Sequence, residues 1–246
     1  MPRTEVLVET PDGRCRATLH VADRDGPRPG VLYYPDAGGV RETFAAMADR
    51  VAEQGYAVLL PDIYYRTPYE PFDTTTLFGD PEEFARLGAL ARTLTPDRIV
   101  ADAGAYLAAL LAREEVVDGR AATVGYCFGG GMAFRAAGHH PERVAAVATF
   151  HGGNLAAADD PDSPHLLVAR MQAAVYVAAA SDDASFDADQ HDRLREAFDA
   201  AGVRGSIETY PAAHGFAVPD NPTHDAAADQ RHREAMAAFM AGAFGS

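Results

Sequence analysis

The thiol of Cys127 is the side chain whose surroundings best suit catalysis. It lies in the segment Gly-Tyr-Cys-Phe-Gly-Gly, residues 125–130, between a short β-prone run and an apolar, alanine-rich helical pattern. A side chain on such a strand-to-helix turn projects at the carboxyl edge of a parallel sheet, where open α/β folds bind their ligands. Glycines two residues before and after it let strand and helix approach closely, as in the G-x-S-x-G elbow. The pattern predicts a nucleophilic thiol in place of a serine, with a buried structural cysteine as the alternative.

Two later segments can supply an acid and a base to this thiol. A strand-like run at residues 174–180 leads into Asp182 and Asp183, and another at residues 206–210 leads towards His214. The chain order is therefore nucleophile, acid and base, with each group just after a strand, which is the order of a hydrolytic triad on an α/β sheet. Either aspartate satisfies this pattern.

Together these motifs resemble the dienelactone hydrolase family of α/β-hydrolases, carboxymethylenebutenolidase-like enzymes that cleave a lactone or an ester through a cysteine. The resemblance extends from about Val31 to the C-terminus. It is most specific at Pro-Asp-Ala-Gly-Gly (35–39), Pro-Asp-Ile-Tyr-Tyr-Arg (61–66), the cysteine elbow and Tyr-Pro-Ala-Ala-His-Gly-Phe (210–216). It implies a single α/β-hydrolase domain over residues 1–246, with a mostly parallel sheet and helices on both faces.

The resemblance also implies a role for each catalytic group. Cys127 would be the nucleophile and His214 the base. Alignment with the family pattern favours Asp183 as the acid that orients the base, 31 residues before it (214 − 183). The backbone amides of Ala37 and Phe128 would form the oxyanion hole.

Four further side chains are candidates for substrate binding. Asp36 aligns with a glutamate that contacts the resting thiol in many family members, and it could equally form an Asx-type turn. Tyr65 and Arg66 begin an aromatic loop and helix at residues 62–96 that would border the pocket. The arginine could hold an acidic substrate or simply be solvated. His151 follows another buried strand and should reach the same sheet edge, where it could line the pocket.

The predicted chemistry is hydrolysis of a small ester or lactone through an acyl-thioester on Cys127. A neighbouring imidazole and a helix N-terminus both favour the thiolate, which is the nucleophilic form. One position departs from the family pattern, because family members hold a substrate carboxylate with an arginine where this chain has Val218. The alternative function is a non-hydrolytic protein on the same fold, either ligand-binding or a thiol redox sensor. Cys15, on a predicted peripheral strand, is the other cysteine available to a redox pair.

Composition limits the remaining classes of function. The chain has 246 residues and a net charge of −15, which opposes binding to nucleic acid or to an anionic membrane. All 21 basic residues are arginine, so Schiff-base, pyridoxal phosphate and P-loop chemistry that requires lysine is excluded. No H-x-x-x-H or C-x-x-C spacing indicates a metal, and no cofactor is expected. The expected partner is a small molecule, and the chain is expected to be a monomer or a small homo-oligomer.

Local sequence patterns also predict the cellular location of the protein and its secondary-structure elements. No signal-peptide core or apolar run of about 18 residues is present, and two reduced cysteines fit a cytoplasmic protein. Residues 1–29 should form a β-hairpin and a loop, and Thr95 should cap a helix that begins with a proline. His232 is expected on a solvated face of the last helix. The predicted helices span residues 42–54, 81–92, 96–113, 166–171, 189–201 and 225–241.

Overall fold

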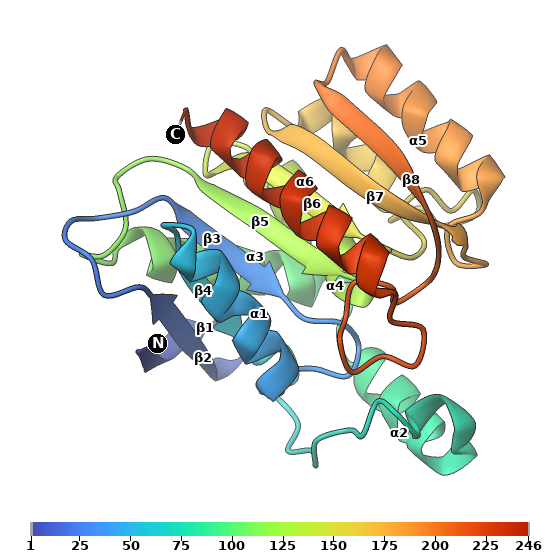
Figure 1. Ribbon diagram of the computed structural model, residues 1–246, viewed down its shortest axis with the longest axis horizontal. Helices are drawn as coiled ribbons and strands as arrows, with labels where there is room; N and C mark the ends of the chain where they lie inside the picture. The colour runs from blue at the N-terminus through green and yellow to red at the C-terminus, as the bar shows by residue number, and fades with distance from the viewer. Residues whose placement is uncertain (1, 246) are drawn as a thin grey trace.

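Eight strands form one sheet in the computed structural model, which describes residues 2–245 apart from the side chain of Phe78. The strand order across the sheet is β1-β2-β4-β3-β5-β6-β7-β8 (Figure 1). The strands are β1 (Arg3–Thr10), β2 (Gly13–Val21), β3 (Gly30–Tyr34), β4 (Ala57–Pro61), β5 (Ala121–Tyr126), β6 (Val144–Phe150), β7 (Ala174–Asp182) and β8 (Gly205–Ala213).

The first two strands form an antiparallel hairpin, and the other six run parallel. β1 pairs with β2 from Arg3 opposite His20 to Thr10 opposite Gly13, and β2 pairs antiparallel with β4. Every residue of β3, β4 and β5 is buried, as expected of parallel strands covered on both faces. The sheet is therefore mostly parallel, as the sequence predicts.

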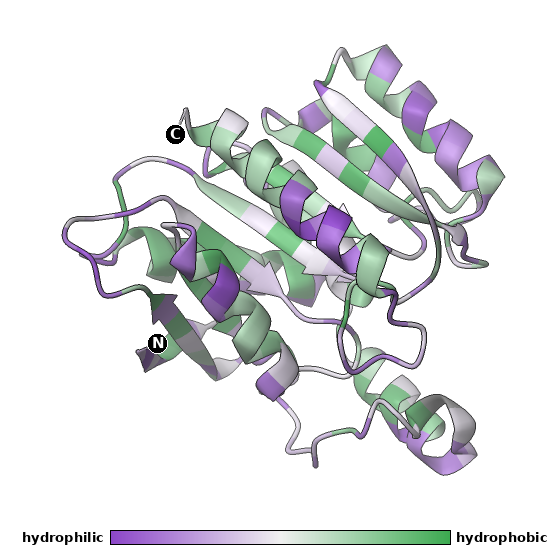
Figure 2. Ribbon diagram, in the orientation of Figure 1, coloured by the Kyte–Doolittle hydropathy of each residue, from purple (hydrophilic) through white to green (hydrophobic). Residues whose placement is uncertain are grey.

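Helices cover both faces of the sheet. One face carries α1 (Glu42–Glu53) and α6 (Ala226–Phe244), whose apolar residues join the strand side chains in one buried cluster. The other face carries α3 (Pro96–Leu111), α4 (Phe128–His139) and α5 (Ala188–Ala201). In Figure 1, α1 and α6 lie in front of the sheet, whereas α3 and α4 lie behind it. Figure 2 shows hydrophilic residues along much of the visible surface of α5, which is the solvent side of an amphipathic helix.

One predicted helix cap is confirmed, and one predicted helix has a different type. Thr95 accepts a hydrogen bond from the amide of Arg98 at the start of α3, which confirms it as the N-cap. The aromatic loop leads to a short 3₁₀ turn, η1 (Leu77–Gly79), and then to α2 (Pro81–Ala91). The helix predicted at 166–171 is instead a 3₁₀ helix, η2 (Pro164–Arg170), because its proline start and short length favour tight turns.

The parallel strands bring distant segments to a common edge. β3, β5, β6, β7 and β8 point the same way, so the residues that follow each of them gather at the carboxyl edge of the sheet. The segments that meet there include the loop at 35–41, Cys127, His151, Asp183 and His214. Topology alone thus assembles the residues that the sequence separates by up to about 180 positions.

Candidate active site

Cys127 occupies a strained turn between β5 and α4. Its backbone has φ 52° and ψ −119°, a conformation that residues other than glycine adopt at a cost. The turn is possible because Gly125 and Gly129 lack side chains. A Cβ on Gly125 would lie 2.0 Å from the carbonyl oxygen of Gly129, and one on Gly129 would lie 2.2 Å from that of Pro35. The predicted close approach of strand and helix is confirmed.

His214 and Asp183 form the second part of the site. His214 Nδ1 lies 2.7 Å from Asp183 Oδ2, and the other carboxylate oxygen accepts hydrogen bonds from the amide and hydroxyl of Ser185. The Asp183 side chain is only 2% exposed. Asp182 is exposed and its side chain makes no hydrogen bond with the imidazole, so the structure brings together the pair that the family pattern favours.

The charge on the imidazole is stabilised by its neighbours. Burial lowers the pKa of His214, but hydrogen bonds with Asp183 and Cys127 outweigh burial and raise that pKa to about 10. Burial also opposes ionisation of Asp183, yet its hydrogen bonds from His214 and Ser185 hold the pKa of the carboxyl below its usual value. Because Nδ1 faces Asp183, Nε2 is the nitrogen that remains for the thiol. The arrangement therefore favours the charged imidazolium form of His214.

Two backbone amides near the cysteine elbow have no hydrogen-bond acceptor among the described residues. Among the described residues, neither Ala37 N–H nor Phe128 N–H donates to another group. Phe128 is also the first residue of α4, where helix amides point outward and the helix dipole favours an anion. Tyr64 Oη donates to the carbonyl oxygen of Ala37 at 2.8 Å and so supports this loop. Sequence analysis missed that role, because Tyr64 lies within an aromatic cluster that has no period.

The side chain of Asp36 binds a backbone amide and an arginine, and it makes no hydrogen bond with the thiol of Cys127. Its Oδ1 accepts from the amide of Gly38 at 2.9 Å, which is the Asx-type turn. Arg41 donates to both oxygens of Asp36 at 2.7 and 2.9 Å and to both oxygens of Asp220 at 2.7 and 2.8 Å. Thr74 donates to the carbonyl oxygen of Asp220. The Arg41 clamp, Asp36–Arg41–Asp220, therefore ties the loop of Ala37 to the segment after His214 and to the aromatic loop.

Tyr65 and Arg66 have partners on the side of α3 and the N-terminal hairpin. Arg66 donates to both oxygens of Asp102 and to Asp12, so each of its three nitrogens faces a carboxylate. Tyr65 Oη lies 2.5 Å from the hydroxyl of Thr10 and donates to Asp102 at 3.0 Å. Binding of a substrate carboxylate by Arg66 would require breaking these ion pairs. The structure thus assigns both side chains structural contacts that the sequence did not reveal.

His151 lies against His214 and is closed off from solvent. Only 1% of the residue is exposed, and neither ring nitrogen has a hydrogen-bond partner among the described residues. Its ring meets that of His214 edge to face at 5.1 Å between centroids. Burial, followed by the charge of His214, holds the pKa of His151 well below the usual value. His151 is therefore a neutral ring behind the candidate base, and not a group on the open surface.

The prediction for His232 is wrong. The ring is 2% exposed, and its Nε2 lies 2.9 Å from Tyr126 Oη while Nδ1 lies 3.1 Å from Asp229 Oδ1. The error has a simple cause, since α6 is so rich in alanine that its buried face cannot be read from periodicity. The polar residues of α6 that face the sheet can be buried there because they form hydrogen bonds with one another and with Tyr126.

Comparison with known proteins decides the family. The profile of the dienelactone hydrolase family matches residues 16–244. The chain belongs to the dienelactone hydrolase family. This membership confirms the predicted α/β-hydrolase fold and the prediction of an ester or lactone hydrolase.

Relatives of similar length support the assignment. A protein of Escherichia coli K12, named provisionally as a carboxymethylenebutenolidase, is 28% identical over 249 residues that cover 92% of this chain and 87% of its own. A Klebsiella pneumoniae structure, named provisionally as a dienelactone hydrolase, has a TM-score of 0.83 and covers 98% of each chain; at 23% identity it shows the fold. A dienelactone hydrolase-like promiscuous phosphotriesterase from metagenomic libraries is 28% identical, with a TM-score of 0.73 and coverage of 96% of this chain and 97% of its own.

Two kinds of feature are absent from the part of the chain that the structure describes. Within residues 2–245, no group of three or more histidine, cysteine or acidic side chains is arranged to hold a metal ion. No helix in that part of the chain has the length and apolar character needed to cross a membrane.

Proposed function

We propose that this hydrolase cleaves small carboxylic esters or lactones through an acyl-thioester on Cys127, with His214 as acid and base and Asp183 as its orienting partner. The observation that carries the proposal is the contact of His214 Nδ1 with Asp183 Oδ2 at 2.7 Å, together with the position of Cys127 on the strained turn at the start of α4. A thiol on a nucleophile elbow, paired with an oriented imidazole, is equipped for acyl transfer.

The first half of the reaction forms the thioester. The thiolate of Cys127 attacks the carbonyl carbon, and the amides of Ala37 and Phe128 receive the negative charge that develops on oxygen. His214, as the imidazolium, gives its Nε2 proton to the leaving oxygen when the carbon–oxygen bond breaks. An alcohol is released, or remains tethered as a hydroxyl group when the substrate is a lactone.

The second half consumes water. Neutral His214 takes a proton from a water molecule, whose oxygen attacks the thioester carbonyl. The carbon–sulfur bond then breaks, the carboxylic acid leaves, and the thiolate and imidazolium are restored. Because a thiolate is a better leaving group than an alkoxide or an amide nitrogen, activated esters, lactones and thioesters should be better substrates than amides.

The redox alternative has weaker support. A sensor of that kind needs a second thiol that can reach and attack the first one. Cys15 is fully buried in β2, and burial raises the pKa of its thiol to about 12, which leaves little reactive thiolate. Both cysteines are free. Since the proposed chemistry requires a reduced thiol, we also propose a cytoplasmic location.

The test is turnover of a substrate panel by the wild type, Cys127→Ala and Cys127→Ser. The panel contains activated aryl esters, simple lactones, a dienelactone and a phosphotriester, the last because of the structural neighbour named above. We expect ester or lactone hydrolysis, an acyl adduct on Cys127 by mass spectrometry, and a loss on the order of 10⁴-fold in Cys127→Ala. Cys15→Ala is the matched control and should retain activity.

Two results would count against the proposal. Ester turnover that survives in Cys127→Ala would show that another group is the nucleophile. Absence of turnover on every ester and lactone, together with rapid oxidation of Cys127 by mild peroxide, would favour the redox function instead.

A further inference from the structure

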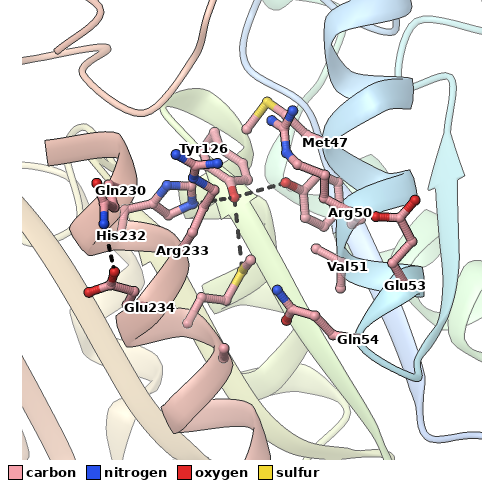
Figure 3. Close-up of a pocket in the computed structure, with 13 residues that line it drawn as sticks. Met47, Arg50, Val51, Glu53, Gln54, Tyr126, Gln230, His232, Arg233 and Glu234 are labelled. Atoms are coloured by element: carbon pink, nitrogen blue, oxygen red, sulfur yellow. Dashed lines mark hydrogen bonds between the residues drawn. The ribbon is translucent and has the colours of Figure 1, made fainter. Parts of the chain in front are cut away.

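Two buried histidines lie against the ring of Tyr126, and they differ in how their nitrogens are paired. His232 has a partner for each nitrogen, because Nε2 lies 2.9 Å from Tyr126 Oη (Figure 3) and Nδ1 lies 3.1 Å from Asp229 Oδ1. The ring of His151 lies 5.9 Å from that of Tyr126 between centroids, and neither of its nitrogens has a hydrogen-bond partner within residues 2–245. The fold thus satisfies one buried imidazole completely and leaves the other unpaired.

The unpaired nitrogens of His151 cost stability. Buried polar groups nearly always have hydrogen-bond partners, because the loss of water without a replacement is unfavourable. The ring of His151 meets that of Phe216 at 5.2 Å and that of His214 at 5.1 Å between centroids, and a phenylalanine could make such ring contacts without this cost. Packing alone therefore does not account for an imidazole at this position.

The backbone also holds His151 in a strained conformation. Its φ of 40° lies in the left-handed region, which residues other than glycine adopt at a cost. Its amide donates to the carbonyl oxygen of Ala178 on β7 at 2.8 Å, and the carbonyl oxygen of the preceding Phe150 accepts from the amide of Cys127 at 3.1 Å. His151 is therefore tied both to the strand that leads to the candidate acid and to the cysteine elbow, so its position beside the candidate base is imposed by the fold.

His214 places a positive charge next to this unpaired ring. Burial and, after it, the charge of His214 hold the pKa of His151 well below its usual value, so His151 stays neutral. A neutral imidazole carries one protonated and one unprotonated nitrogen. Because no hydrogen bond fixes either nitrogen, His151 can adopt the tautomer whose dipole is favourable to the neighbouring charge. Such an interaction is strong where water is excluded.

Four further titratable groups surround the two rings. Asp183, at the end of β7, lies 2.7 Å from His214 Nδ1, and Cys127 lies at the start of α4. Tyr126 of β5 contacts His151, and His232 of α6 would oppose a charge on His151 if it were itself protonated. Burial lowers the pKa of His232 and so favours its neutral form. His151 is the neutral group among them whose polar atoms are not already engaged.

We propose that His151 is a positioning residue for His214, because its neutral imidazole packs against the ring of His214 and turns an unprotonated nitrogen towards the imidazolium, whose charge it stabilises. The use of that imidazolium in catalysis rests on the proposed function, whereas the effect of one ring on the charge of the other does not. Removal of the nitrogens of His151, with the ring retained, should therefore make His214 lose its proton at a lower pH.

The first test is a pH titration of the wild type, labelled with ¹⁵N in its histidines, by NMR. The ring nitrogen shifts report both charge and tautomer, and His214→Gln and His151→Asn assign the two signals. As His214 loses its proton, at a pH of about 10, the tautomer balance of His151 should change while the ring stays neutral. Nitrogen shifts of His151 that stay constant through this titration would overturn the proposal. Because this test uses the wild type, it does not depend on how well a variant folds.

The second test is His151→Phe, which keeps a ring and removes both nitrogens. We expect the pH at which His214 loses its proton to fall by roughly one unit, a common size for the shifts that folded proteins impose. The shift is measured by NMR and as the alkaline limb of kcat/KM for an activated ester, and the rate well below the limb should change little. His151→Asn tolerates a left-handed backbone and offers a polar oxygen, so it should keep more of the wild-type limb.

His232→Phe is the matched control. It removes a buried imidazole that contacts Tyr126 and Phe150, so it should lower the melting temperature without moving the limb. An equal shift in His232→Phe, or a His151→Phe rate that falls at every pH with the limb unmoved, would reduce His151 to a structural role and overturn the proposal. Absence of ester turnover, with the NMR shift of His214 still present in His151→Phe, would remove only the proposed function.

Discussion

His214 is the residue on which the proposed chemistry most depends, because the proposal has it serve the acid Asp183 and the thiol of Cys127 alike. Asp183 receives three hydrogen bonds, one from His214 and two from Ser185. The bonds from Ser185 hold the carboxylate in place, and the carboxylate in turn orients the imidazole ring. His151 packs against the same ring from behind. The imidazole therefore has little rotational freedom, and its Nδ1 stays on Asp183.

The pH dependence of Asp183→Asn tests this arrangement. Burial lowers the pKa of His214, but Asp183 and Cys127 raise it to about 10, so the imidazolium persists through neutral pH and is lost as pH rises through that value. Without the carboxylate, the alkaline limb of kcat/KM should move towards the ordinary histidine value of about 6.5. The rate should fall by on the order of 10²- to 10⁴-fold. The measurement is kcat/KM for an activated ester across this pH range.

A matched control is available in the neighbouring residue. Asp182 is exposed, and its side chain does not hydrogen-bond to His214, so Asp182→Asn should keep both the rate and the alkaline limb of the wild type. An unchanged limb in Asp183→Asn, or an equal shift in Asp182→Asn, would show that the carboxylate does not set the charge of His214.

At the scale of elements, the site depends on loops that the Arg41 clamp holds together. Arg41 is 9% exposed in its side chain and bridges Asp36 and Asp220, which lie at opposite ends of the chain. Burial opposes the charge of Arg41, but the two carboxylates raise its pKa further above its already high value. The clamp links the loop that carries Ala37 to the loop that follows His214. Both loops must hold their positions when an oxyanion forms between them.

Replacing Arg41 should impair the chemical step more than substrate binding. Arg41→Gln leaves Asp36 and Asp220 facing each other without a cation, so the loop of Ala37 should shift. Misplacement by about 1 Å can cost on the order of 10²-fold in rate. We expect kcat for an activated ester to fall by roughly that factor, with a smaller change in KM.

Arg41→Lys separates charge from geometry. Lysine keeps the charge but cannot form two forked pairs, so it should recover only part of the lost kcat. Melting temperatures of both variants are measured alongside kcat and KM. A fall in melting temperature with kcat unchanged would mean that the clamp stabilises the fold without positioning Ala37.

At the scale of the whole molecule, the excess of negative charge opposes compact folding. The chain carries 36 acidic and 21 basic residues, which leaves −15 at neutral pH. Some of the acidic side chains form ion pairs, as in the contacts of Arg3 with Glu42 and Asp49. Because acidic residues outnumber arginines, many carboxylates have no arginine to pair with. Self-repulsion of this kind is screened by salt over a Debye length of about 10 Å at 0.1 M.

Added salt should therefore stabilise the protein. We expect the melting temperature to rise by about a few degrees as NaCl increases from roughly 0.02 to 0.5 M, with most of the change at the lower concentrations. KCl serves as the control and should act equally, since screening does not depend on the cation. A melting temperature that falls with salt would mean that surface ion pairs outweigh the net repulsion.

Local sequence was enough to predict the elbow and the chain order of the candidate nucleophile, acid and base, and the family resemblance added a sheet with helices on both faces. The glycines around Cys127 indicate a tight turn because any Cβ there would strike the backbone, and that constraint is short-range. Positions of the acid and base follow from the rule that parallel strands end at one edge, which needs only the strand pattern. The sequence determined the kind of site for this reason: each of these signals is contained within a few neighbouring residues.

The tertiary structure decided which polar side chains meet. Arg41 and Asp220 are separated by 179 positions, and Tyr126 and His232 by 106. The sequence alone is compatible with Arg66 as an unpaired cation, whereas in the structure Arg66 is paired with Asp102. Periodicity states whether a residue faces inward, but a hydrogen bond requires two particular atoms within about 3 Å. Partners of that kind are chosen by the packing of the whole chain, so no local pattern could have named them.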